Sequence, residues 1–186
     1  MTQTTEGQPH IESGSLRERL ERHHFDASGW SLACCNHDED LAHDVLHEAY
    51  VRVLDGRARY RAKSSFKTWL FGVIRLVALE VRRRDERRGV ETGVETGVEN
   101  SAEPAVVPPM DLASRSLEQV ELVARLNEAL TGLSCRQREV MHLVFYQSLT
   151  VAEAARVMGV GVGAARTHYH RAKTRLRKVL SQESVR

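Results

Sequence analysis

The chain has 186 residues, which is enough for one domain of ordinary size or two small ones, and only 5% of them are aromatic. A core built mainly from Leu, Val and Ala suits a helical bundle better than a β-sandwich. No apolar run reaches about 18 residues, which excludes a membrane-spanning helix, and the polar stretch 1–15 excludes a secretion signal there. We therefore expect an all-α protein that works in the cytoplasm, without membrane insertion.

The net charge of +2 conceals a strong segregation of charge along the chain. Residues 1–56 carry 4 basic and 11 acidic side chains, whereas residues 57–88 carry 11 basic and 3 acidic ones. Residues 89–115 are acidic again, with 1 basic and 5 acidic side chains, and residues 116–186 are basic, with 11 and 6. Two basic blocks separated by acidic ones predict two contacts with a polyanion, while the acidic N-terminal part faces a different partner.

The first helical pattern begins at Ser15. It follows residues 1–14, which we expect to be disordered because they lack apolar periodicity. Ser15 can cap the helix, and Glu18 three residues later completes a capping box. Gly29 is expected to interrupt the helical pattern, because glycine is a poor helix former. The apolar face consists of Leu16, Leu20, Phe25 and Trp30.

Two further helices follow, and a basic loop at residues 57–67 separates them. Acidic residues at 38–40 favour the positive end of the helix dipole, and Asp55 with Gly56 ends this second helix. The apolar spacing rests on Leu41, Val45, Leu46, Ala49, Val53 and Leu54 in the second helix, and on Trp69, Leu70, Val73, Ile74, Val77 and Val81 in the third. The third helix ends in an arginine run of Arg82, Arg83, Arg84, Arg87 and Arg88.

Residues 89–115 divide the chain. They contain the tandem repeat GVETGVETGVE, followed by Pro104, Pro108 and Pro109. Glycine at every fourth position and a cluster of prolines cannot sustain a helix or bury a core. We therefore expect a flexible linker that joins one small helical domain at 15–88 to a second at 116–186.

The second domain is expected to be helical throughout. One amphipathic helix covers about residues 117–133, and Ser134 caps the next, at 136–146. Thr150 opens a third helix, with Glu153 completing another capping box, and Gly159 closes it. A fourth helix covers about residues 163–180.

Residues 150–171 carry a helix-turn-helix pattern. Ala154 and Ala155 are small where two helices cross closely, and Gly159 provides the turn. A helix that enters the major groove needs polar and basic side chains for base and phosphate contacts. The helix after the turn offers Arg166, Thr167, His168, His170, Arg171 and Lys173. The alternative is an ordinary helical hairpin with a solvated basic face.

The basic block at residues 57–88 also contains aromatic rings. Rings beside a cationic groove suit single-stranded nucleic acid, because bases stack on the rings while Arg and Lys hold the backbone. The alternative is that Trp69 or Phe71 belongs to the core and that the arginine run is a generic phosphate contact. The four rings are Tyr60, Phe66, Trp69 and Phe71.

No catalytic motif occurs, so we expect no enzyme activity, no cofactor and no metal. Cys34, Cys35 and His37 could begin a metal site or sense redox state, but no second ligand pair follows at helical spacing. Buried thiols in a reducing compartment are the simpler interpretation, since three cysteines (the third is Cys135) are no disulfide framework. A metal-dependent enzyme is an alternative that would use the paired histidines His23, His24, His43 and His47.

Three stretches resemble a known family. They are residues 42–50 (AHDVLHEAY), 65–75 (SFKTWLFGVIR) and 133–143 (LSCRQREVMHL), the last followed by the helix-turn-helix. In this order they resemble the sigma-70 family of RNA polymerase sigma factors, specifically its extracytoplasmic-function (ECF) group, which keeps only regions 2 and 4. The resemblance implies a region 2 bundle and a region 4 helix-turn-helix. It also implies a protein that binds core RNA polymerase, reads the −35 and −10 promoter elements and promotes melting.

The resemblance also implies a division of labour among residues. Docking of residues 38–54 on the β′ clamp helices would use Asp44, His47, Glu48 and Arg52. Capture of the non-template strand at the −10 element would use Arg59, Tyr60, Lys63, Ser64, Ser65, Lys67, Arg75, Arg82, Arg83 and Arg84. The −35 duplex would be read by Thr150, Glu153, Arg166, Thr167, His168, His170, Arg171 and Lys173. The β flap of polymerase and an anti-sigma factor are further implied partners.

Several positions depart from the family pattern. His47 stands where the family usually has Gln, and Leu76 stands where it usually has Asn. In the reading helix the departures are Ala164, Ala165 and His168. We therefore do not infer its promoter preference from that of any relative. A stand-alone helix-turn-helix regulator is the main alternative function, and it would bind duplex DNA unaided, usually as a symmetric dimer.

Overall fold

The computed structural model describes residues 15–91, 129–130 and 132–181, and every regular element in these ranges is helical. The all-α prediction is therefore confirmed. The expected disorder at 1–14 and most of the expected linker and 117–133 helix lie outside the described residues. In chain order the helices are α1 (Leu16–Arg22), α2 (His24–Cys34), α3 (Glu39–Leu54), α4 (Phe66–Glu91), α6 (Cys135–Met141), η2 (His142–Tyr146), α7 (Val151–Met158) and α8 (Val162–Ser181).

The helix caps follow the sequence closely in the N-terminal part. The backbone N–H of Glu18 donates to Ser15 Oγ (3.3 Å), and that of Ser15 donates to Glu18 Oε2 (3.0 Å), which confirms the capping box. The expected interruption at Gly29 is wrong, because the chain breaks its helix at His23 and α2 continues through Gly29. A glycine inside a helix costs only about 1 kcal/mol. The burial of Trp30 beside it more than offsets that cost.

The core of the first unit lies between α2, α3 and α4. Trp30 is 1% exposed, and its indole Nε1 donates to the carbonyl oxygen of Phe71 at 3.0 Å. Ser31 Oγ donates to the carbonyl oxygen of Ala42 at 2.7 Å, which ties α2 to α3. Asp38 caps α3 by accepting from the backbone N–H of Leu41. These contacts fix α3 and the start of α4 as a rigid frame for the loop between them.

Helix α4 is longer than the sequence predicted. It continues through Glu91, three residues past the expected boundary at residue 88, so the first residues of the glycine repeat are helical. Extending an existing helix adds one hydrogen bond for each residue that is fixed, which offsets the low helix propensity of a single glycine. Residues 92–115 of the expected linker lie outside the described residues.

The second unit consists of α6, η2, α7 and α8. Thr150 caps α7 with Glu153, and Gly159 ends it in the left-handed conformation at φ 65°, both as predicted. The predicted continuous α-helix at 136–146 is wrong in its second half, where residues 142–146 form a π-helix. A π-turn widens the helix by one residue. The widened turn is followed by Ser148, which takes a positive φ of 55°.

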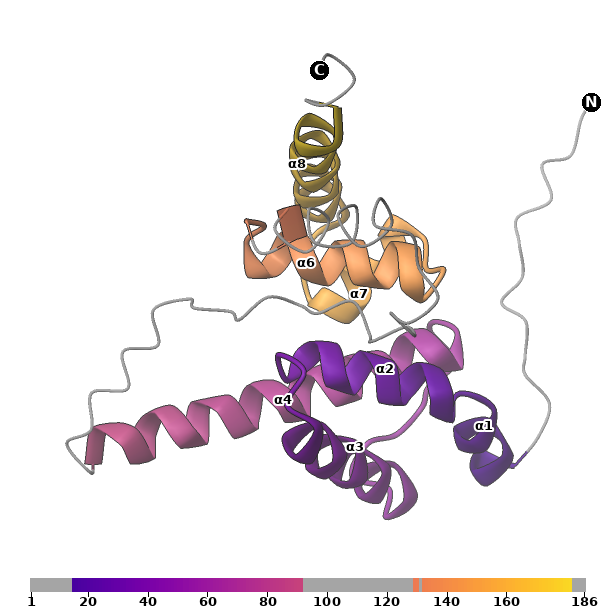
Figure 1. The fold of residues 1–186 in the computed structure, drawn as a ribbon. Helices are drawn as coiled ribbons and strands as arrows, with labels where there is room; N and C mark the ends of the chain where they lie inside the picture. The colour runs from indigo at the N-terminus through magenta and orange to yellow at the C-terminus, as the bar shows by residue number, and fades with distance from the viewer. Residues whose placement is uncertain (1–14, 92–128, 131, 182–186) are drawn as a thin grey trace, which may run out of the picture.

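The two units pack against each other in the described structure. Figure 1 shows α6 and α7 lying over α2 and the first part of α4, while the second half of α4 and most of α8 project away. Helix α7 contacts α4, and η2 contacts α2. The ring of His142 in η2 lies 5.4 Å from that of Trp30, centroid to centroid. The two sequence halves therefore share one interface rather than lying apart.

Candidate nucleic-acid interface

Helix α8 presents a one-sided basic surface. Its buried residues Ala165, Ala172 and Leu176 anchor it on the rest of the second unit. Between Val162 and Ser181 the sequence contains six Lys or Arg residues and no acidic residue. Exposed side chains on the free face are Arg166, Thr167, His170, Arg171 and Lys173, and His168 is half-buried. A helix with this face has the charge and shape to enter a DNA major groove.

Two of the departures in the reading helix, Ala164 and Ala165, differ in their exposure to solvent. Ala164 is exposed at the start of α8, whereas Ala165 is fully buried. Ala165 therefore contributes to packing between the helices, and its small size permits a close approach. Thr167 Oγ1 donates to the carbonyl oxygen of Gly163 at 3.0 Å, so its hydroxyl is already engaged within the helix. The remaining polar atoms of this face belong mainly to the arginine, lysine and histidine side chains.

Thr150 and Glu153 form the N-terminal cap of α7. The backbone N–H of Thr150 donates to Glu153 Oε2 (2.9 Å), and the backbone N–H of Glu153 donates to Thr150 Oγ1 (3.2 Å). Thr150 Oγ1 also donates to Glu153 Oε2 at 2.7 Å. The structure therefore gives both residues a local role in starting α7. Their predicted contact with the −35 element stays a prediction.

The loop between α3 and α4 holds half of the residues predicted for strand capture, and the other half lie in α4. Arg59 and Lys63 are exposed, and Arg59 Nε donates to the carbonyl oxygen of Gly56 at 3.3 Å. The hydroxyl of Tyr60 donates to the carbonyl oxygen of Ser64 at 2.6 Å, which closes the loop on itself. Ser65 Oγ accepts from the backbone N–H of Thr68 and so starts α4. The loop is thus short, internally bonded and basic.

Three aromatic rings meet at the base of this loop. The centroids of Tyr60, Phe66 and Trp69 lie 5.2–5.3 Å from one another. Phe66 is 1% exposed and Phe71 is fully buried, so these two rings belong to the core. Tyr60 and Trp69 are only partly buried and reach the surface. The core alternative is therefore correct for Phe71, while Tyr60 and Trp69 remain available to stack with bases.

Several of the predicted strand-binding cations are engaged within the protein. Lys67 Nζ lies 2.8 Å from Asp26 Oδ2 and donates to the carbonyl oxygen of Gln147 in the second unit at 2.9 Å. Arg75 is 8% exposed, and its Nε lies 2.9 Å from Glu139 Oε1. Arg82 donates to the carbonyl oxygen of Cys34. Arg83 and Arg84 are exposed. In this arrangement Arg75 is covered by the second unit and cannot reach DNA.

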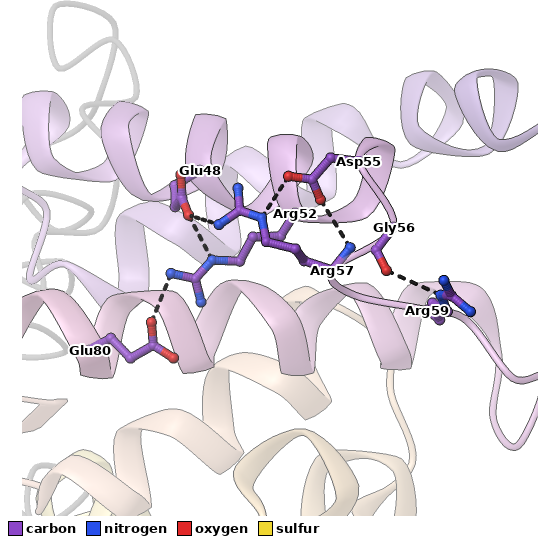
Figure 2. A network of polar contacts seen from close by, with 7 residues as sticks. All are labelled: Glu48, Arg52, Asp55, Gly56, Arg57, Arg59 and Glu80. Atoms are coloured by element: carbon purple, nitrogen blue, oxygen red, sulfur yellow. Dashed lines mark hydrogen bonds and ion pairs between the residues drawn. The ribbon is translucent and has the colours of Figure 1, made fainter.

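Two of the four predicted polymerase-binding residues, Glu48 and Arg52, belong to an ion-pair network at the end of α3, which Figure 2 shows from close by. Arg52 Nε lies 2.7 Å from Glu48 Oε1, and Arg52 Nη2 lies 2.8 Å from Glu80 Oε2 on α4. Glu48 also accepts from Arg57, whose Nε pairs with Asp55 at 2.6 Å. The hydrogen bond from Arg52 holds the pKa of Glu48 below its usual value. Asp44 and His47 are exposed on the same helix.

The cysteine and histidine candidates do not gather into one cluster of possible ligands. No group of three or more potential metal ligands comes together among the residues that the structure describes. Burial raises the pKa of the Cys34 thiol and raises the pKa of Cys35 to about 11, which keeps both thiols protonated. Burial also lowers the pKa of His142 to about 4.

Among the helices that the structure describes, none combines the length and the hydropathy that a membrane span requires.

Comparison with known proteins decides the family. Residues 21–88 match the family model for Sigma-70 region 2, and residues 129–178 match the model for Sigma-70, region 4. The chain belongs to the sigma-70 family. The two matched ranges lie inside the two expected domains and contain both basic surfaces. Sigma factors are transcription initiation factors rather than catalysts. This sigma factor serves promoter-directed transcription initiation by RNA polymerase.

Curated relatives of this sigma factor belong to the ECF group. The ECF RNA polymerase sigma factor SigX of Bacillus subtilis is 29% identical over 143 residues, covering 76% of this chain and 71% of SigX. The ECF RNA polymerase sigma factor SigC of Mycobacterium tuberculosis is 28% identical over 147 residues, covering 79% of this chain and 74% of SigC. The ECF assignment drawn from the sequence is therefore confirmed.

Solved structures share the fold. The sigma factor RpoE in complex with the anti-sigma factor NepR, from Bartonella quintana, has a TM-score of 0.65 and 22% identity, covering 90% of this chain and 97% of RpoE. CnrH in complex with the cytosolic domain of CnrY has a TM-score of 0.57 and 20% identity, covering 91% of this chain and 92% of CnrH. These likenesses confirm the expected arrangement of helices in this sigma factor.

Proposed function

We propose that this sigma factor reads its promoter with two chemically different surfaces. Helix α8, which carries six basic and no acidic side chains, binds the −35 element as duplex. The loop at residues 57–65 binds the opened −10 strand, because its cations lie beside the partly exposed rings of Tyr60 and Trp69. This pairing of an acid-free helix with a ring-bearing loop is the observation that carries the proposal.

The polymerase-binding surface is the exposed face of α3. Asp44 and His47 point to solvent there, and Glu48 and Arg52 lie on the same helix within the network of Figure 2. Arg52 bridges Glu48 to Glu80, so it fixes α3 against α4 in addition to any contact it makes with polymerase. We therefore assign Asp44 and His47 to direct docking, and Glu48 and Arg52 to holding the docking face in shape.

Promoter binding requires the two units to separate. The −10 and −35 elements are separate stretches of the promoter, and the two basic surfaces assigned to them lie on different units. The ion pair with Glu139 in the second unit keeps Arg75 buried, so the units must separate before Arg75 can contact the −10 strand. Residues 92–128 could span about 120 Å if fully extended. We infer that binding to core polymerase replaces the contact between the units and places each one on its own element.

An anti-sigma factor is a further expected partner. One of the two solved structures described above is a complex with the anti-sigma factor NepR, and the other is a complex with the cytosolic domain of CnrY. We propose that this chain also binds an anti-sigma factor, which holds it inactive until its signal arrives. The sigma factor then acts in the cytoplasm, where RNA polymerase transcribes, and the β flap of polymerase is the expected contact of the second unit.

Binding to core enzyme separates this function from that of a stand-alone regulator. The purified full chain is mixed with core RNA polymerase and with duplex DNA, each alone, and complexes are detected by size-exclusion chromatography. The proposed function predicts a stable complex with core and weak binding to duplex. Asp44→Ala with His47→Ala should weaken the core complex, whereas Arg17→Ala, which removes an exposed charge on α1, should not. Tight duplex binding by a dimer, with no core complex, would contradict the proposal.

A further inference from the structure

Helix α1 brings a cation to the aromatic rings at the base of the strand-binding loop. The guanidinium carbon of Arg19 lies 5.8 Å from the ring centroid of Tyr60 and 5.7 Å from that of Phe66. Both distances are within the range of a cation–π contact. His23 at the end of α1 also stacks on Phe66, with centroids 6.0 Å apart. Arg19, like the rest of the acidic segment 1–56, had no role in nucleic-acid binding predicted from the sequence.

The position of Arg19 is set by the ends and the buried face of α1. Ser15 and Glu18 form the capping box that starts the helix, and Leu20 is buried at 5% exposure. Residues one position apart on a helix lie on adjacent faces, so anchoring Leu20 turns the half-buried Arg19 toward the rings. Arg17, two positions earlier, points to solvent and pairs with Glu21 at 2.9 Å.

Tyr60 is held by contacts within its loop and from two helices, α4 and α1. Its hydroxyl bonds to Ser64 within the loop, its ring meets Phe66 edge-on, and Trp69 lies at a tilt. The Arg19 contact comes from a different helix and joins the loop to the body of the unit. A ring that is held in place before binding loses less rotamer freedom when a base packs on it.

We propose that Arg19 is a positioning residue for single-strand capture, which holds Tyr60 in the orientation that accepts an unstacked base. The proposal rests on the proposed function of the loop, in which Tyr60 stacks with the opened −10 strand. Arg19 acts through Tyr60 and therefore has little effect once that ring is removed. A direct contact between Arg19 and a phosphate would behave differently, because its effect would be independent of Tyr60 and would change the salt dependence of binding.

The experiment measures strand binding by the holoenzyme. The full chain is assembled with core RNA polymerase, and the probe is a fluorescein-labelled single-stranded oligonucleotide. Its sequence is the non-template −10 strand of a promoter located by mapping transcription start sites after overexpression. Dissociation constants come from fluorescence anisotropy at several salt concentrations. The variants are Arg19→Ala, Arg19→Lys, Tyr60→Ala and the double variant Arg19→Ala with Tyr60→Ala. Arg17→Ala is the matched control, since it removes the same charge from the same helix.

The expected result is a non-additive pattern. Arg19→Ala weakens binding about fivefold with an unchanged salt slope, as loss of a cation–π contact predicts. Tyr60→Ala weakens binding about tenfold or more. The double variant is no weaker than Tyr60→Ala, and Arg19→Lys, which keeps a cation over the rings, recovers most of the loss. Arg17→Ala matches the unaltered protein. Circular dichroism melting of each variant confirms that the helices remain folded.

Two results would overturn the proposal. One is an additive loss in the double variant together with a shallower salt slope, which would make Arg19 a phosphate contact. The other is a failure of the single variants. Arg19→Ala would then bind the strand as tightly as Arg17→Ala, or Arg19→Lys would bind it as weakly as Arg19→Ala. Failure of the loop's proposed function looks different, because Tyr60→Ala would then bind the strand as tightly as the unaltered protein.

Discussion

Arg75 in α4 and Glu139 in α6 form a nearly buried ion pair between the two units of this sigma factor, with Nε and Oε1 2.9 Å apart. Arg136 Nη1 lies 3.0 Å from the other carboxylate oxygen of Glu139. The pair joins a residue that the family resemblance assigns to the −10 strand with a residue beside the helix-turn-helix. The contact therefore makes promoter binding and packing between the units mutually exclusive at Arg75.

Removing the carboxylate should open the protein. In Glu139→Gln the guanidinium of Arg75 loses its charged partner while buried, which costs about 3 kcal/mol. Separation of the units returns Arg75 to water and relieves that cost. We expect a larger radius of gyration by small-angle X-ray scattering. Glu21→Gln, which breaks an exposed pair, serves as the control.

A second variant tests the same contact from the other side. Arg75→Met with Glu139→Leu replaces the pair by apolar side chains, a change that is often neutral or stabilising in a buried site. This double variant should stay as compact as the unaltered protein. A scattering curve for Glu139→Gln identical to that of the unaltered protein would contradict the role assigned to the pair.

Arg171→Ala should weaken binding to the −35 duplex in the holoenzyme. Arg171 is exposed on the acid-free face of α8, so we expect it to neutralise one phosphate. Loss of one phosphate contact lowers affinity for all sequences alike and reduces the salt slope by about one. Electrophoretic mobility shifts at several salt concentrations measure both quantities. An unchanged slope would show that Arg171 faces away from DNA.

Thr150→Ala should destabilise the second unit. The change removes the side-chain oxygen that accepts from the backbone N–H of Glu153, and loss of such a cap costs about 1 kcal/mol. Thr150→Ser keeps the oxygen and should retain most of the stability. Urea unfolding followed by circular dichroism measures the difference. Equal stability of the Ala and Ser variants would rule out the capping role.

Acid should destabilise the protein through His142. Its folded pKa of about 4 lies below the ordinary value of 6.5, so between these pH values the unfolded chain binds a proton that the folded chain does not. The part of the unfolding free energy that depends on His142 is therefore fully present above pH 6.5. It is lost as the pH falls toward 4. His37, whose pKa is also lowered by burial, acts in the same direction.

Substitution of His142 isolates its share of the pH dependence. His142→Gln removes the titrating ring, so the difference in stability between pH 7 and pH 5 should become smaller than in the unaltered protein. Urea titrations at the two pH values give this difference. The account of His142 fails if the variant and the unaltered protein lose the same stability.

The features predicted correctly from the sequence are local ones. Ser15, Thr150 and Gly159 act within one helical turn, so residue type and spacing suffice to place each cap. Long-range partners leave no such signal. Glu139 lies 64 positions from Arg75, and Arg19 lies 41 positions from Tyr60, so neither contact follows from periodicity. Gly29 misled the prediction because the cost of glycine in a helix is small compared with the burial of Trp30 beside it.

Run-off transcription tests the central claim most directly. Purified chain and core RNA polymerase are incubated with a linear duplex template whose promoter comes from start-site mapping after overexpression. The account predicts a transcript of defined length that requires the chain, that decreases with Tyr60→Ala and with Arg171→Ala, and that persists with Arg17→Ala. The account would be contradicted if no transcript depended on the chain, while the same core enzyme transcribed normally with another sigma factor.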